Sequence, residues 1–202
     1  MTLYGNDSNE RRTVSLILGV VAIVLAYILN EVLAPRFISL PWWFDAPSVL
    51  GFYSLTYLAF EKGLWRIAAR LNLLSVPDLN GRWEGVLRSS HDQHALDRHV
   101  RVTIAQTWSR MTIILDARES RSESVLVGIA TENRLNPRLM YEYLSKPGSS
   151  ARESMEIHEG TTVLDFDRGA EVLEGYYYTG RGRLNHGSVT LRRRDGASED
   201  GW

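Results

Sequence analysis

An uncharged apolar run near the N-terminus constrains this chain more than any other feature. Residues 14–29 read VSLILGVVAIVLAYIL, and extension to Leu33 gives about the 20 residues that a helix needs to cross a bilayer. The run is longer than the apolar part of a usual signal peptide, and no small-residue cleavage site follows it. It therefore predicts a transmembrane helix that the mature protein keeps.

A second apolar stretch, residues 46–60, predicts another membrane span. Aromatic residues precede it at positions 42–44, where side chains of the membrane interface are expected, and Glu61 and Lys62 follow it. Its length is borderline for a span, so a buried helix of a soluble domain is the alternative.

The flanking basic residues predict the orientation of the two spans. Arg11 and Arg12 precede the first span and three more basic residues follow the second, whereas the connecting loop at 34–45 holds only Arg36. Loops rich in Lys and Arg stay on the cytoplasmic side. We therefore expect a multi-pass membrane protein with both termini in the cytoplasm.

Beyond Pro77 the apolar pattern changes to the alternation that is typical of β-strands. Many short antiparallel strands with short connections favour a barrel or a sandwich, and we predict an eight-stranded antiparallel barrel. The predicted domains are a transmembrane hairpin with a juxtamembrane helix at 1–76, a cytoplasmic barrel at 77–194 and a flexible tail at 195–202. The predicted strands are 82–90, 98–108, 110–118, 122–131, 138–145, 154–167 with a bulge at Gly160, 171–179 and 187–194.

Two details support a barrel with one buried face. In the second predicted strand, Val100, Val102 and Ile104 share a face, as inward residues of a barrel would. The segment that opens the domain, Gly81-Arg82-Trp83, is similar to the G-x-W start of lipocalin-type barrels, in which the Trp closes one end. A barrel of this size has room for its own side chains or for one small ligand.

Composition narrows the chemistry. The chain has 23 basic and 24 acidic residues, which argues against binding a nucleic-acid polymer, and it has no cysteine. It has no G-x-S-x-G, H-E-x-x-H or Gly-rich phosphate loop, so we expect no enzyme and no cofactor. The cluster His91, His94, Asp97 and His99 lies in a predicted hairpin loop and matches no structural zinc spacing, so no metal site is expected.

The segment 175–194, GYYYTGRGRLNHGSVTLRRR, has the composition of a small-nucleotide site. Aromatic faces stack on bases and arginines pair with phosphates. The alternative is an ordinary strand with a hairpin turn and a solvated end. The candidate ligand-binding residues, chosen on chemistry, are Tyr176, Tyr178, Arg181, Arg183, Asn185, Trp83, Arg88 and Tyr141.

The whole layout resembles the SMODS-associating, two-transmembrane, β-strand-rich effectors of bacterial CBASS antiphage systems. The similarity includes the paired spans, the opening LNGRWEG at 79–85 and the closing GYYYTGRGRLNHG at 175–187. This resemblance implies a barrel that binds a cyclic dinucleotide, followed by homo-oligomerisation and disruption of the membrane lipid. Small residues at Gly19, Ala22 and Ala26 would let helices pack closely. The alternative is a membrane-anchored lipocalin-like protein that binds an apolar ligand or a protein partner.

Overall fold

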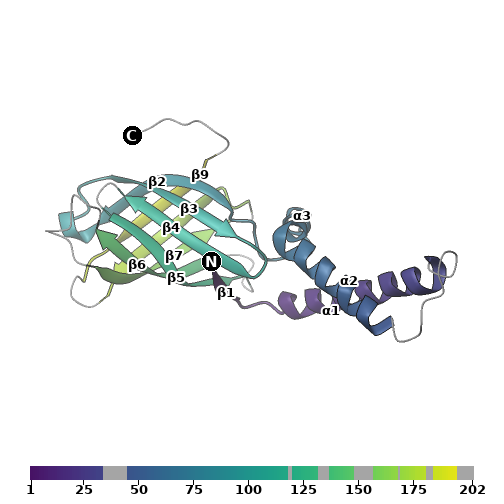
Figure 1. Cartoon of the computed structure of the whole chain (residues 1–202). Helices are drawn as coiled ribbons and strands as arrows, with labels where there is room; N and C mark the ends of the chain where they lie inside the picture. The colour runs from purple at the N-terminus through teal and green to yellow at the C-terminus, as the bar shows by residue number, and fades with distance from the viewer. Residues whose placement is uncertain are drawn as a thin grey trace. The chain divides into compact units, whose positions relative to one another are not determined.

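The computed structural model describes residues 1–33, 45–117, 120–131, 137–147, 157–167, 169–180 and 184–194 (Figure 1). The chain divides into two compact units. Ser8–Ser75 form a helical unit, and Met1–Asp7 join the chain from Val76 onward in a β-barrel unit. The first seven residues thus belong with the barrel, although the sequence analysis grouped them with the helical hairpin.

The helical unit contains two helical stretches that pack against each other. The first is α1 (Glu10–Tyr27), continued by the π-helical segment η1 (Ile28–Leu33). The second is α2 (Asp45–Ala59), continued by η4 (Phe60–Leu64) and α3 (Trp65–Arg70). The connecting loop and the aromatic residues at 42–44 lie outside the described residues.

Every fourth residue of α1 is buried, which marks the face that packs. These residues are Val14, Leu18, Ala22 and Ala26. Small side chains on this face allow close contact with α2, as the sequence predicts for Ala22 and Ala26. At its far end Asn30 Nδ2 donates a hydrogen bond of 3.0 Å to Ser48 Oγ, so the amide in this apolar stretch has a partner.

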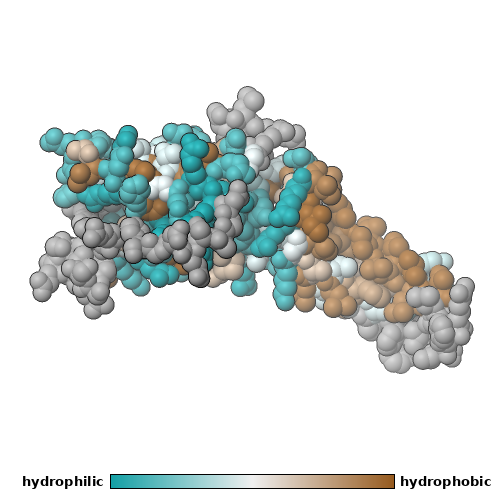
Figure 2. All heavy atoms as spheres, turned by 90° about the horizontal axis from the view of Figure 1, so that it is seen from above, coloured by the Kyte–Doolittle hydropathy of each residue, from teal (hydrophilic) through white to brown (hydrophobic). Residues whose placement is uncertain are grey.

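The opposite face of α1 exposes large apolar side chains, and Figure 2 shows apolar residues in brown over the helical unit. Within the described residues, one helix is long and apolar enough to cross a membrane: Glu10–Val32, with 23 residues. Helix α2 coincides with the second expected span, but its crossing of the membrane is not confirmed and stays a prediction, as does the orientation.

The barrel unit is a closed sheet, built in the described residues from nine strands. The order around the barrel is β1-β4-β3-β2-β9-β8-β7-β6-β5 (Figure 1). The strands are β1 (Thr2–Asn6), β2 (Gly81–Ser89), β3 (Arg98–Gln106), β4 (Arg110–Ala117), β5 (Ser120–Ala130), β6 (Arg138–Pro147), β7 (His158–Phe166), β8 (Val172–Thr179) and β9 (His186–Arg193).

Strands β2 to β9 match the strands that alternation predicts, and β1 corrects the predicted count of eight. Strand β1 pairs antiparallel with β4, with Leu3 opposite Arg110, and parallel with β5, with Tyr4 opposite Val127. The sheet is therefore not wholly antiparallel. The sequence gives little sign of β1, because it is five residues long and of these only Tyr4 is buried.

The bulge expected at Gly160 is absent, because the pairing of β6 with β7 runs through Gly160 without a shift. A Cβ at Gly160 would lie 2.3 Å from the Tyr143 hydroxyl, so a glycine is needed there to make room for the tyrosine. The register shift lies instead in β5, between Ser124 and Leu126. The beginning of the predicted strand 154–167 and the tail 195–202 lie outside the described residues.

One end of the barrel is closed by Trp83, which is fully buried. Its indole Nε1 donates to the Leu79 carbonyl at 3.1 Å, and the Arg193 guanidinium carbon lies 4.8 Å from the ring centroid. The side chain of Gln106 holds the incoming chain, with Oε1 accepting from Leu79 N and Nε2 donating to Pro77 O. The predicted role of the G-x-W tryptophan therefore agrees with its position.

Candidate ligand-binding site

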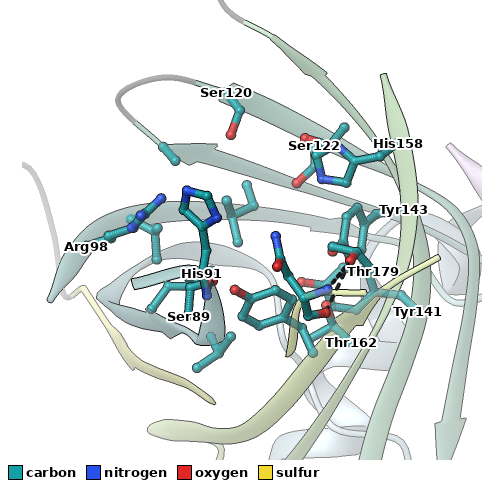
Figure 3. Close-up of a pocket in the computed structure, with 18 residues that line it drawn as sticks. Ser89, His91, Arg98, Ser120, Ser122, Tyr141, Tyr143, His158, Thr162 and Thr179 are labelled. Carbon is teal, nitrogen blue, oxygen red and sulfur yellow. Dashed lines mark hydrogen bonds between the residues drawn. The ribbon is translucent and has the colours of Figure 1, made fainter. Parts of the chain in front are cut away.

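The opposite end of the barrel contains a cavity of about 350 Å³ (Figure 3). Among β2 to β9, the even-numbered strands contribute their last residues and the odd-numbered strands their first residues. These residues meet at one end because consecutive strands in this series are antiparallel. The lining residues are Leu87, Ser89, His91, Arg98, Val100, Leu115, Ala117, Ser120, Ser122, Tyr141, Tyr143, Ser145, His158, Thr162, Tyr177, Thr179, Asn185 and Val189.

The cavity wall is rich in buried hydroxyl groups. Ser89, Ser122, Ser145, Thr162 and Thr179 are all at most 8% exposed, and their hydroxyls can each donate and accept hydrogen bonds. A lipid carrier needs an apolar interior, whereas this wall would place polar hydroxyls against a hydrocarbon chain. The lining therefore suits a polar ligand.

Three tyrosines supply the aromatic surface of the cavity. Tyr141 and Tyr143 lie on β6 with ring centroids 6.3 Å apart, and the His158 ring meets Tyr143 edge-on at 6.4 Å. Tyr177 lines the cavity from β8. Burial raises the pKa of Tyr141, and a hydrogen bond with Thr162 opposes this shift only in part. The Tyr141 phenol therefore stays protonated at neutral pH and can donate to a ligand.

One arginine and one histidine of the cavity lie near the start of β3. Arg98 lines the cavity together with His91, and Figure 3 places these two side chains near each other. The Arg98 Nη2 is 3.0 Å from the Asp92 carboxylate, which orients the guanidinium. Asp92 lies in the short 3-10 helix η5 (Ser90–Asp92), just after β2. An anionic group would find its strongest partner here.

The structure brings two of the predicted ligand-binding residues, Tyr141 and Asn185, into this cavity. The backbone of Asn185 is tied to Thr179, with Asn185 N donating to Thr179 Oγ1 at 2.9 Å. Arg181 and Arg183 lie outside the described residues, so their contribution stays a prediction.

The other predicted residues lie elsewhere. Trp83 closes the far end of the barrel. Arg88 is on the outer surface, with Nε 2.6 Å from Asp97 Oδ1 and a side chain that is 55% exposed. Tyr176 and Tyr178 are 50% and 48% exposed and point outward, while Tyr177 between them points inward.

The predicted set misses Tyr177, Tyr143, Arg98 and the two histidines of the cavity. The sequence does contain a signal for Tyr177, because Leu173, Tyr177 and Thr179 have the same parity along β8 and all are buried. For the histidine-rich loop, the described residues contain no group of three or more side chains placed to hold a metal ion. His91 faces the cavity, His94 approaches His186, and Asp97 pairs with Arg88.

A closed barrel with a plugged end and a polar, partly aromatic cavity at the other end is typical of a receptor domain for a small polar molecule. Residues 74–193 match the family described as "Cap15, cyclic dinucleotide receptor domain". The chain is also 32% identical over 152 residues to CD-NTase-associated protein 15 of Yersinia aleksiciae, covering 74% of this chain and 71% of the relative. The chain belongs to the Cap15 family, which confirms the resemblance to this group of CBASS effectors.

Proposed function

We propose that the chain is a CBASS effector that senses a cyclic dinucleotide, and that the ligand binds in the hydroxyl-lined cavity. The observation that carries this proposal is the combination of buried hydroxyls, tyrosines and one cavity-lining arginine within the matched receptor domain. Bases would stack on the tyrosines, the hydroxyls would bind ribose and base edges, and a phosphate would pair with Arg98.

The volume is compatible with this assignment. Small-molecule pockets usually measure about 300–1,000 Å³, and the cavity of about 350 Å³ falls in that range. A cyclic dinucleotide carries two phosphates, so one half of the ligand would occupy the interior while the other half reaches the open end. Arg181 and Arg183 follow β8, which ends at that opening with Thr179, and are the proposed partners of the outer phosphate.

The proposal extends to the membrane. Helix α1 would anchor the chain in the inner membrane, α2 would form the second span, and both termini would face the cytoplasm, where the ligand is made. Ligand binding would promote homo-oligomerisation, and association of the spans would disrupt the membrane and kill the infected cell. Asn30 is a polar residue within this apolar unit, and it could take part in contacts between helices in such an assembly.

Neighbouring tyrosines of β8 give the sharpest binding test. The full-length chain in detergent micelles is titrated by calorimetry with a panel of cyclic dinucleotides. Replacing the inward Tyr177 by Leu should weaken binding by about 1–3 kcal/mol, the usual contribution of one stacked base. The matched control, Tyr176→Leu, removes an outward tyrosine and should bind as the wild type does. Equal effects of the two changes, or no binding to the wild type, would overturn the proposal.

The effector step needs its own experiment. Cells that express the full-length chain are compared with and without a synthase of the best-binding cyclic dinucleotide, and membrane integrity is followed with an impermeant dye. We expect dye entry only when the synthase is present, and none when residues 14–60 are deleted. Dye entry that is the same with and without the synthase would contradict the effector role. Ligand binding would still be tested separately by calorimetry.

A further inference from the structure

Strand β1 fills a gap between β4 and β5. These two strands pair directly at three positions, the first with Ile114 opposite Glu123 and the last with Asp116 opposite Arg121. Toward the start of β4 and the end of β5 the two strands separate, and the Ile113 N–H donates to the Ser124 side chain at 2.9 Å. Strand β1 then bridges the two, pairing with β4 on one side and β5 on the other.

The directly paired section of β4 and β5 is also a wall of the cavity. Leu115 and Ser122 lie opposite each other in this section, and both line the cavity. Ala117 and Ser120 continue the same wall toward the open end. The cavity and β1 therefore share the same two strands, one at each end of the β4–β5 seam.

A few specific contacts hold β1 in place. Tyr4 is 2% exposed and its hydroxyl donates to the Trp108 carbonyl at 2.9 Å. The Asp7 carboxylate accepts from the Thr131 N–H at 2.8 and 3.0 Å. The apolar helix α1 begins at Glu10, so β1 is the tether through which the N-terminal end of that helix joins the barrel.

The pairing between β4 and β5 could extend along the register that they already have. The matched receptor domain, residues 74–193, contains β2 to β9 and leaves β1 out. Continuing the β4–β5 register by one step would place Ile113 opposite Ser124, the residues already joined by a hydrogen bond. Without β1, β4 and β5 could pair over more residues, and the backbone groups that now bond to β1 would bond to each other. An open barrel would instead leave these groups exposed at its edges.

We propose that β1 is a detachable strand and that a ligand spanning the β4–β5 seam favours its release. This inference rests on the proposed function, since it concerns regulation of the same cavity. A ligand in contact with both Leu115 and Ser122 holds β4 against β5, which favours the longer direct pairing over the insertion of β1. Release would free the N-terminal end of α1. By linkage, a docked β1 must weaken ligand binding by the same factor.

An engineered disulfide tests this coupling, because the chain has no cysteine of its own. Leu3 and Arg110 lie opposite each other on β1 and β4, and both are exposed, so L3C/R110C can form a disulfide that locks β1 in place. Full-length protein in micelles is titrated in its oxidised and reduced forms with the tightest-binding cyclic dinucleotide of the panel. Allosteric couplings are typically 5-fold or more, so oxidation should weaken binding by roughly 5-fold or more, and reduction should restore it.

The matched control places a disulfide elsewhere in the wall, at Glu174 and Thr190, which pair on β8 and β9. Oxidation of E174C/T190C should leave the affinity unchanged. A second variant, Tyr4→Ala, loosens β1 and should tighten binding. Equal affinities in the oxidised and reduced L3C/R110C protein, or unchanged affinity in Tyr4→Ala, would overturn the coupling although the ligand still binds. A wild type that binds no cyclic dinucleotide would instead overturn the proposed function.

Discussion

The Arg98 guanidinium lies 3.0 Å from the Asp92 carboxylate, beside the cavity that Arg98 lines. The ion pair orients the guanidinium, whose N–H groups would bind a phosphate at this position. We predict that Arg98→Gln lowers the affinity for a cyclic dinucleotide roughly tenfold, the lower end of what a hydrogen bond to a charged group contributes, because the side chain is 38% exposed. Calorimetry on the full-length chain measures the change.

The control for Arg98 is Arg88, which pairs with Asp97 on the outer surface. Arg88→Gln removes the same charge from the protein and should not change the affinity. If both changes weaken binding equally, the effect comes from net charge and Arg98 has no direct role.

Alkaline pH should destabilise the barrel through Tyr141. Its pKa is raised by burial above the ordinary value of 10.0, so the unfolded chain loses this proton first as the pH rises. The unfolded state then binds fewer protons than the folded state, and stability falls as the pH rises past about 10. The melting temperature of Tyr141→Phe should therefore fall less between about pH 8 and about pH 10.5 than that of the wild type. Tyr176→Phe, at a half-exposed position, should behave as the wild type does.

Gly175 is needed for the close passage of β7 and β8. A Cβ at this position would lie 2.0 Å from the Val163 carbonyl oxygen, so Gly175→Ala must move the backbone. We expect a loss of about 1–3 kcal/mol of stability, measured as a lower melting temperature. Gly128→Ala is the control, because a Cβ at Gly128 would meet nothing within 4 Å. Similar losses in the two variants would contradict this explanation.

The basic residues around the apolar segments predict that the C-terminus faces the cytoplasm. A C-terminal fusion to a reporter that is active only in the cytoplasm should be active, and a fusion to a periplasmic reporter should be silent. The opposite result would place the barrel on the side of the membrane away from a cytosolic ligand.

Alternation along the sequence predicts most of the barrel wall but not the direction of each tyrosine. Val100, Val102 and Ile104 are buried as expected, because three apolar residues with the same parity specify a face. In the run Tyr176-Tyr177-Tyr178 every residue is equally aromatic, and a register slip of one residue exchanges inside and outside. The parity that Tyr177 shares with Leu173 and Thr179 favours Tyr177, and the pairing of β8 with β9, with Tyr177 opposite Gly187, fixes which ring enters the cavity.

The sequence does not predict strand β1, for a different reason. Its partners on β4 and β5 are more than 100 residues away, as the hydrogen bonds from Tyr4 to Trp108 and from Thr131 to Asp7 show with separations of 104 and 124 residues. Local propensity carries no information about such pairing. The sequence also does not distinguish Arg98, which lines the cavity, from Arg88 on the outer surface, because the two differ in direction and not in residue type.

The insertion of the helical unit between β1 and β2 also sets the order in which the chain can mature. Strand β1 leaves the ribosome first, but its partner residues extend to Thr131, 124 residues after Asp7. The apolar helix α1 is made in this interval and can enter the bilayer before any barrel exists. If α1 anchors the chain as proposed, barrel closure is a late event on a chain already at the membrane, because β1 can pair only after β4 and β5 have been made. The proposed anchor would then make the bilayer surface the place where the barrel assembles.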